Sequence, residues 1–203
     1  MIVIVDYGMG NLGSIRNMLK KVEVESIVSS DPKEIAKADK LILPGVGAFD
    51  HAMTNVNALK LIPLLNEKVL VEKVQLLGVC LGMQLLTKRS EEGSLPGLGW
   101  VDAETVRFKF TNSKLKVPHM GWNTVEVKRD DPLFRDMYEE PRFYFVHSYY
   151  VRCNGPNNVL TTTNYGGDFC SSLVKDNIRG VQYHPEKSHK FGMKLLKNFA
   201  DLK

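Results

Sequence analysis

A cysteine that stands between two glycines is the residue pattern in this chain most suited to chemistry. Gly78, Cys80 and Gly82 follow an apolar run at 74–77, and helical spacing of apolar residues begins directly after them. A strand that turns sharply into a helix, with a nucleophile at the turn, is the nucleophile-elbow arrangement. Neighbouring strands crowd the positions two residues before and after the nucleophile, so glycine fits there most easily. The pattern predicts a nucleophilic thiol at a helix N-terminus, where the dipole favours thiolate and N–H groups can face an oxyanion.

A thiol nucleophile needs a base, and His184 is the best candidate for it. His184 follows a predicted strand that begins at Gly180, so it and Cys80 can meet at one edge of a sheet. Pro185 imposes an extended backbone on His184, and Glu186 would then face the same side of the chain. A carboxylate there can accept a hydrogen bond from the imidazole and fix its tautomer. We therefore expect a catalytic triad of Cys80, His184 and Glu186.

Other interpretations of these residues stay open on the residues alone. Most free cysteines are small buried hydrophobes, and Cys80 could be one of them. His119 and His147 compete with His184 for the role of the base. The choice depends on which histidine the fold brings to the thiol.

The composition is that of an ordinary globular protein. The chain has 203 residues, 43% of them hydrophobic and 25% charged, and we expect a single domain over residues 1–203. The net charge is +4, but the basic residues are scattered, which disfavours nucleic-acid binding. No apolar run reaches membrane-spanning length, so we expect no membrane association. Cys80, Cys153 and Cys170 are odd in number and widely spaced, which argues against disulfides and a metal cluster and favours the cytoplasm.

The first half of the chain predicts the elements that must position the thiol. Short predicted strands at 2–5, 24–28, 40–43 and 74–79 alternate with segments of helical spacing, which indicates a parallel, doubly wound α/β sheet. Glycine-rich loops at 6–11 and 44–49 follow two of these strands, at the sheet edge where ligands bind.

The first glycine-rich loop has a second interpretation. Gly8, Gly10 and Gly13 formally meet the spacing of a dinucleotide-binding loop, and Asp31 lies near the position of its acidic residue. A lone match of this kind is a weak signal, and we expect no cofactor.

In the second half of the chain, successive short strands replace the alternation of strands and helices. Short strand patterns at 101–108, 124–127, 142–146, 159–163 and 169–174 predict antiparallel strands added to the same sheet. The predicted strand that begins at Gly180 and an amphipathic helix at 191–199 close the chain. No linker-like tract or repeat separates the two halves.

The segments around these motifs resemble a known family. Residues 78–84 and 184–186 are similar to the class I, or triad, glutamine amidotransferases. The segments 6–11, 44–47, 145–149 and 184–188 narrow the likeness to the members that are glutaminase subunits of imidazole glycerol phosphate synthase. The resemblance covers essentially the whole chain, and its most specific part is Pro-His-Met-Gly-Trp-Asn at 118–123.

The resemblance implies hydrolysis of L-glutamine to glutamate and ammonia. Cys80 would attack the side-chain amide to form a thioester, and His184 would move the protons. Backbone N–H groups of Leu81 and of Val46 or Gly47 would form the oxyanion hole. The positions that hold the polar groups of glutamine in this family correspond here to Gln84, Glu92, Ser148 and Tyr149.

The resemblance also implies a partner. Ammonia would pass to a (β/α)8-barrel cyclase subunit in a heterodimer of histidine biosynthesis. The partner-facing positions correspond here to Asn11, Trp122, Tyr144 and Lys187, and the loop at 8–10 would face the partner rather than a dinucleotide.

Three alternatives remain after the resemblance. One is a paralogous glutaminase subunit that supplies ammonia for sugar amination or amidination in surface-polysaccharide synthesis. Another is a different Cys-His-Glu hydrolase of the same fold, such as a peptidase or a γ-glutamyl hydrolase. The last is a non-catalytic binding domain, which the intact Cys80, His184 and Glu186 disfavour.

Overall fold

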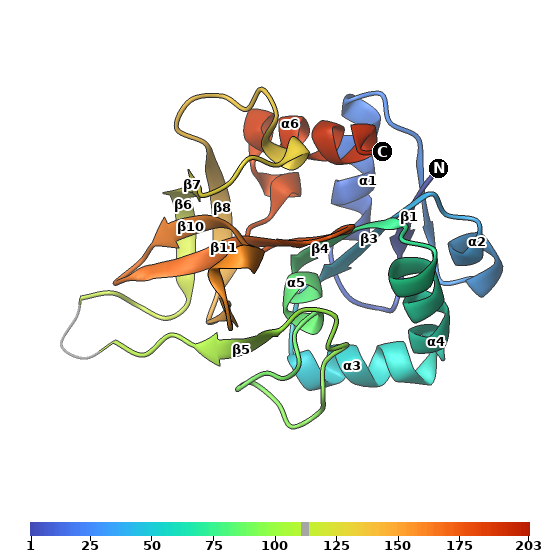
Figure 1. Ribbon diagram of the computed structural model, residues 1–203, viewed down its shortest axis with the longest axis horizontal. Coiled ribbons are helices and arrows are strands. Elements are labelled where there is room, and N and C mark those ends of the chain that lie inside the picture. The colour runs from blue at the N-terminus through green and yellow to red at the C-terminus, as the bar shows by residue number, and fades with distance from the viewer. Residues whose placement is uncertain (111–113) are drawn as a thin grey trace.

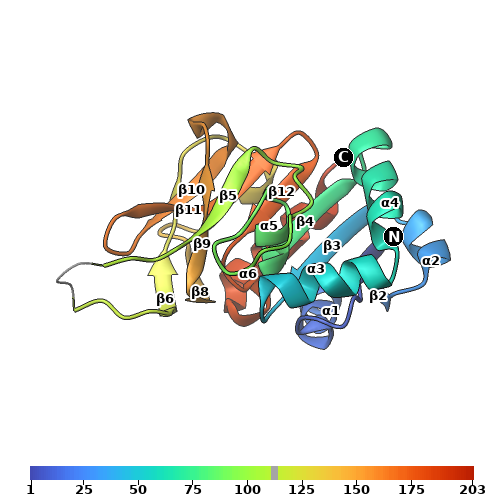
Figure 2. The same ribbon diagram turned by 90° about the horizontal axis from the view of Figure 1, so that it is seen from below.

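A computed structural model describes residues 1–110 and 114–203, and within them a mixed sheet runs through the molecule with helices on both faces (Figures 1 and 2). The strands are β1 (Ile2–Val5), β2 (Ser26–Ser29), β3 (Lys40–Gly45), β4 (Gln75–Cys80), β5 (Ala103–Arg107), β6 (His119–Thr124), β7 (Glu126–Val127), β8 (Arg142–His147), β9 (Tyr149–Cys153), β10 (Val159–Asn164), β11 (Asp168–Lys175) and β12 (Ile178–Val181). The α-helices are α1 (Leu12–Lys21), α2 (Pro32–Ala36), α3 (Phe49–Ala58), α4 (Leu61–Asn66), α5 (Leu81–Leu85) and α6 (His189–Asp201). Among these helices of the described residues, none is long and apolar enough to cross a bilayer.

The parallel part of the sheet places both halves of the chain side by side. Its strands stand in the order β2-β1-β3-β4-β12, so a strand from near the C-terminus lies against the one that ends at Cys80. In this pairing Val181 is opposite Val79. Because parallel strands end at the same edge of a sheet, the residues that follow β3, β4 and β12 meet there. The predicted mostly parallel, doubly wound sheet is confirmed.

Antiparallel strands extend the sheet beyond β12, as predicted. They follow in the order β11-β10-β7, and β9 joins β11 to β5. Strands β6 and β9 are additions that the sequence pattern did not predict. Strand β6 carries His119, Gly121 and Asn123 on one face, so it lacks the apolar alternation of a half-buried strand, and it pairs with β8 in a separate two-stranded sheet.

Two apolar layers hold the helices against the sheet. On one face α1 and α6 pack with residues such as Ile4 and Val181 (upper side of Figure 1). On the other face α3, α4 and α5 pack with residues such as Val5 and Leu43. The central strands are therefore buried on both sides, which explains their continuous apolar composition.

The turn from β4 into α5 has the expected strained geometry. Cys80 has φ +54° and ψ −109°, a conformation that residues with side chains rarely adopt. A Cβ on Gly82 would lie 1.7 Å from the carbonyl oxygen of Leu43, and one on Gly78 would lie 2.8 Å from the carbonyl oxygen of Gly82. Both neighbours are backbone atoms, which cannot move without displacing β3 or α5. The two glycines thus allow β4, α5 and β3 to approach closely enough to form the turn.

We predict that Gly82→Ala lowers the free energy of unfolding by about 3 kcal/mol or more, because its methyl group overlaps backbone. Gly13→Ala is the matched control: a Cβ there meets nothing within 4 Å, and in helix α1 the change should stabilise by ~0.5–1 kcal/mol. Chemical denaturation of both variants measures the difference. Equal stabilities would show that the turn does not need the glycine.

Candidate active site

All four residues expected to bind glutamine line one cavity of about 330 Å³ at the carboxyl edge of the parallel strands. Cys80 and His184 both face it, although they are far apart in the sequence. The whole lining comprises Val46, Gly47, Cys80, Leu81, Gln84, Glu92, Pro118, Val146, His147, Ser148, Tyr149 and His184. The structure therefore brings together the expected nucleophile, base, oxyanion-hole and glutamine-binding positions.

Cys80 is buried at the end of β4, with two polar neighbours that the sequence analysis did not single out. Nε2 of Gln182 donates to Sγ of Cys80 at 3.7 Å. The hydroxyl of Tyr7 donates to the carbonyl of Pro44, which precedes the loop with Val46. Burial, and then the nearby Cys80, raise the pKa of Tyr7, so this hydroxyl stays protonated. Gln182 stands two residues before His184, but only the fold shows that its amide reaches the thiol.

His184 is part of the cavity wall, and Glu186 forms a buried pair with it from behind. Nδ1 of His184 lies 2.8 Å from Oε1 of Glu186, and each side chain is 2% exposed. Nε2 of His184 is buried and has no hydrogen-bond partner among the described residues, so it is the ring nitrogen free to exchange a proton. Burial by itself lowers the pKa of His184, but the interactions with Cys80 and Glu186 outweigh it and raise the pKa to about 10.

The chain beyond His184 corrects one expectation. His184 is extended, with φ −102° and ψ 96°, as Pro185 requires. The extended path expected beyond it is wrong: Pro185–Lys187 form a 3₁₀ turn, with proline at the first position of the turn. Glu186 therefore reaches the imidazole because the turn folds it back. The N–H of His184 donates to the carbonyl of Tyr144 at 2.9 Å, and Ser188 Oγ donates to the His184 carbonyl at 2.6 Å.

The two competing histidines, His119 and His147, lie near the same cavity, but their pKa values are lowered rather than raised. Nδ1 of His119 and Nε2 of His147 are 3.0 Å apart, and Nδ1 of His147 is 2.7 Å from the carbonyl of Tyr149. Burial lowers the pKa of His147 to about 3 and that of His119 to about 4. Their ring nitrogens are engaged with protein partners, so the geometry favours His184 as the base.

Glu92 faces the cavity from a long connection between α5 and β5. Its Oε2 accepts a hydrogen bond from the N–H of Phe49 at 3.0 Å, and burial raises its pKa. Asp50, next to Phe49, accepts the N–H groups of Ser94 and Leu95, both at distances near 3 Å. The start of α3 thus fixes the connection at Glu92 and directly after it.

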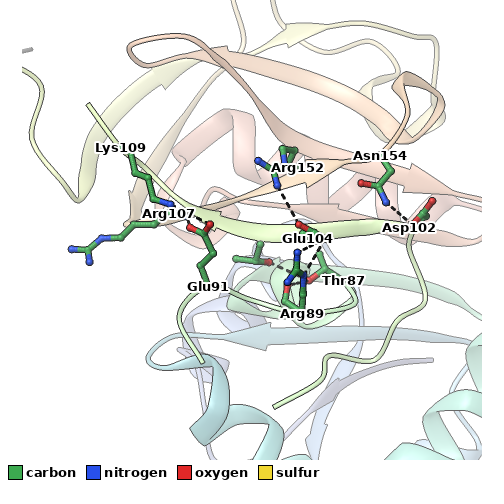
Figure 3. A network of polar contacts seen from close by, with 10 residues as sticks. Thr87, Arg89, Glu91, Asp102, Glu104, Arg107, Lys109, Arg152 and Asn154 are labelled. Carbon is green, nitrogen blue, oxygen red and sulfur yellow. Dashed lines mark hydrogen bonds and ion pairs between the residues drawn. The ribbon is translucent and has the colours of Figure 1, made fainter. Parts of the chain in front are cut away.

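Charged pairs tie the same connection to the sheet (Figure 3). Glu104 on β5 lies 2.9 Å from Arg89 and 3.2 Å from Arg152. Glu91 pairs with Lys109 at 3.2 Å and accepts the N–H of Arg107 at 2.8 Å. These contacts are largely exposed, so each contributes little stability, but together they restrict the position of the neighbouring Glu92.

Three of the four expected partner-facing residues lie together outside the cavity lining. Trp122, 46% exposed, stands opposite Tyr144 in the β6–β8 pair, with ring centroids 6.3 Å apart. Nζ of Lys187 lies 5.7 Å from the Tyr144 ring centroid. Asn11 caps helix α1, where its Oδ1 accepts the N–H of Ser14 at 3.4 Å.

Within residues 1–110 and 114–203, no three His, Cys, Asp or Glu side chains converge on a metal-binding geometry.

Comparison with known proteins gives matches over almost the full chain. The family model "Glutamine amidotransferase class-I" matches residues 3–202. The imidazole glycerol phosphate synthase subunit HisH 2 of Methanococcus maripaludis is 59% identical over 199 residues, 98% of each chain. The subunit HisH 2 of Pseudomonas aeruginosa is 49% identical over 202 residues, 100% of each chain. Methanococcus maripaludis also has a subunit HisH 1, which is 46% identical over 205 residues, 100% of each chain.

Solved structures agree on the fold. A crystal structure of a glutamine amidotransferase superposes with a TM-score of 0.73 at 18% identity, covering 100% of both chains. A glutamine amidotransferase of Thermotoga maritima gives a TM-score of 0.66 at 18% identity, covering 98% of this chain and 82% of that one. The chain therefore belongs to the class I glutamine amidotransferases and, within them, to the family of imidazole glycerol phosphate synthase subunits HisH.

Proposed function

We propose that this chain is a glutaminase subunit that hydrolyses L-glutamine to glutamate and ammonia for imidazole glycerol phosphate synthesis, in histidine biosynthesis. The observation that carries the proposal is the cavity that Cys80 and His184 share, with Glu186 paired to the imidazole behind it. The match of the family model over residues 3–202 supports a single amidotransferase domain. We also propose that this domain acts in the cytoplasm and needs no cofactor or metal.

The first chemical step is attack of the Cys80 sulfur on the side-chain amide carbon of glutamine. The N–H of Leu81, the first residue of α5, has no partner within its helix and can donate to the developing oxyanion. The N–H of Val46 or Gly47 is the second donor across the cavity. The polar groups of glutamine are held by Gln84, Glu92, Ser148 and Tyr149, which line the same space.

His184 carries the protons of the reaction. Its free Nε2 takes the thiol proton and gives a proton to the leaving ammonia, while Glu186 accepts the Nδ1 hydrogen and stabilises the imidazolium. A γ-glutamyl thioester remains on Cys80. Water then adds to the thioester carbon with His184 as base, which releases glutamate and restores the thiol.

We propose that the partner is a cyclase subunit, a (β/α)8 barrel that receives the ammonia within a heterodimer. Support comes from the exposed apolar side chains beside the cavity: Met120 is 61%, Trp122 46% and Val117 37% exposed. Single exposed apolar residues are ordinary, but neighbouring ones next to a functional cavity are typical of a docking surface. Asn11, Tyr144 and Lys187 belong to the same proposed interface.

A second candidate is a paralogous glutaminase subunit that supplies ammonia for sugar amination or amidination in surface-polysaccharide synthesis. One observation favours keeping it: Methanococcus maripaludis has two proteins named as HisH, and this chain is more similar to copy 2 than to copy 1. The cavity of this chain is compatible with both pathways, because the acceptor of the ammonia would bind to the other subunit.

We predict low glutamate release by the purified chain, and a sharp rise when a histidine-pathway cyclase subunit is added together with its ribulosyl ligand. Cys80→Ala should reduce the stimulated rate roughly 10⁴-fold or more, because the nucleophile is lost.

Glutamate formation is the measurement for both predictions. Surviving turnover in Cys80→Ala would refute the mechanism, and a rate that never rises would favour the polysaccharide pathway. Faster cleavage of γ-glutamyl peptides by the isolated chain would instead indicate a different hydrolase.

We predict that Glu186→Gln lowers the pKa of His184 from about 10, because the carboxylate no longer stabilises the imidazolium, although the contact with Cys80 still raises the pKa. At pH values between the lowered pKa and the native one, the variant imidazole loses the proton that the native one keeps. NMR titration of the His184 ring measures the shift. Glu139→Gln, at an exposed position, should leave the titration unchanged, and an unchanged His184 pKa in Glu186→Gln would contradict the assignment.

We predict that Lys187→Ala weakens stimulation by the partner and its ligand roughly fivefold or more, because a coupling contact is lost. The rate of Cys80 alkylation in the free chain should stay the same, since Lys187 lies outside the cavity lining. Lys33→Ala, at an exposed position of helix α2, is the control for loss of a surface charge. Unchanged stimulation and ammonia transfer would remove Lys187 from the interface.

A further inference from the structure

We propose that His119 and His147 are positioning residues of the glutamine pocket, which with Asn123 form a directed hydrogen-bond relay that holds the Tyr149 carbonyl and the Gln84 amide in place. The proposal rests on the proposed glutaminase function, which makes Gln84 and Tyr149 part of the substrate site. It adds a role for side chains of β6 and β8 that do not take part in the chemistry.

The relay starts at Asn123 and runs inward across the β6–β8 pair. Nδ2 of Asn123 donates to Nε2 of His119 at 3.3 Å. Nδ1 of His119 donates to Nε2 of His147 at 3.0 Å, where the two residues stand opposite each other in the strand register. Nδ1 of His147 donates to the carbonyl of Tyr149 at 2.7 Å.

Backbone groups at both ends set the direction of these hydrogen bonds. A carbonyl can only accept, so His147 carries its hydrogen on Nδ1, and its Nε2 must accept from His119. At the other end, Oδ1 of Asn123 accepts the N–H of Thr124 at 2.9 Å, and Nδ2 donates to the carbonyl of Asn164 at 3.0 Å. Asn123 is thus oriented with its donor toward His119. Both imidazoles are therefore Nδ1–H tautomers, and all members of the relay are satisfied.

The carbonyl of Tyr149 joins the relay to the nucleophile. It also accepts from Nε2 of Gln84 at 3.2 Å. The other hydrogen of the same amide goes to Oε1 of Gln182 at 3.1 Å. Nε2 of Gln182 then donates to Sγ of Cys80 at 3.7 Å. A change in the relay therefore alters the orientation of Gln84 first, and that of Gln182 only through it.

The surroundings of the two histidines keep them neutral, as the relay requires. His119 is 3% and His147 6% exposed, and the His119 ring stacks on Tyr165 with centroids 4.0 Å apart. Burial lowers both pKa values well below neutrality. A proton on either Nε2 would remove an acceptor and leave two donors facing each other.

The relay also connects the cavity to the exposed face of β6. Side chains alternate along the strand, so His119 and Asn123 point to one side, while Met120 and Trp122 are exposed on the other. A partner that docks on Met120 and Trp122 presses on the strand that sets the His119 position. The geometry of the pocket is then sensitive to the partner without any partner side chain entering it.

The tautomers are tested in the wild-type chain itself. With ¹⁵N-labelled histidine at pH 7, we expect His119 and His147 each to show a protonated Nδ1 and an unprotonated, hydrogen-bonded Nε2. Substitutions at the two positions assign the signals. An Nε2–H tautomer or an imidazolium at either residue would overturn the relay, whatever the activity of the chain.

Kinetics of the complex with the cyclase subunit, in the presence of its ribulosyl ligand, test the positioning role. His147→Phe keeps a ring but removes both hydrogen bonds, and should raise KM for glutamine roughly 3–10-fold with kcat nearly unchanged. His147→Asn keeps a donor where Nδ1 stands and should restore most of the loss. His51→Asn, at an exposed position of α3, is the matched control.

Each outcome decides between two explanations of the histidine pair. An unchanged KM in His147→Phe overturns the positioning role. A KM in His147→Asn that is raised as much as in His147→Phe assigns the effect to packing and also overturns it. If the wild-type complex has no glutaminase activity, the proposed function fails, and the tautomer measurement alone then decides whether the relay exists.

Discussion

The close approach of three backbone segments at Gly82 is the constraint on which the rest of the site depends. There is no room for a side chain between α5 and the carbonyl of Leu43, and only this contact lets the chain leave β4 and enter a helix within one residue. Cys80 is held at positive φ as a result, with its sulfur in the cavity and the first N–H groups of α5 beside it. The strain at Cys80 persists because the buried strands on either side define the path of the chain.

Strand order supplies the second requirement, which is a base. Strand β12 is close to the end of the chain, yet it lies against β4 because parallel pairing of apolar strands buries both faces of each. Val181 opposite Val79 then places Gln182 and His184 beside Cys80. The 3₁₀ turn after His184 adds the carboxylate of Glu186, so nucleophile, base and orienting group depend on a single strand pairing.

The histidines around the cavity show how environment divides one residue type between two roles. His184 and His147 are both buried, and burial alone lowers the pKa of each. His184 faces Glu186 and Cys80, whose interactions with the imidazolium reverse the effect. His147 faces a neutral imidazole and a carbonyl, so the effect of burial remains. One ring can therefore carry protons through a reaction, while the other keeps a fixed tautomer and holds the wall of the cavity.

The sequence by itself determined the elbow at Cys80, the parallel half of the sheet and the triad candidates, because each depends on neighbours within a few residues or on a regular period. Tertiary structure decided the rest. Strands β6 and β9 exist through pairing with distant strands rather than through their own pattern. The amide of Gln182 reaches the thiol, and His119 meets His147, only because strands far apart in sequence are adjacent. Protonation likewise followed from the fold, since the burial of each histidine depends on distant segments, and Glu186 reaches His184 only through the turn at 185–187.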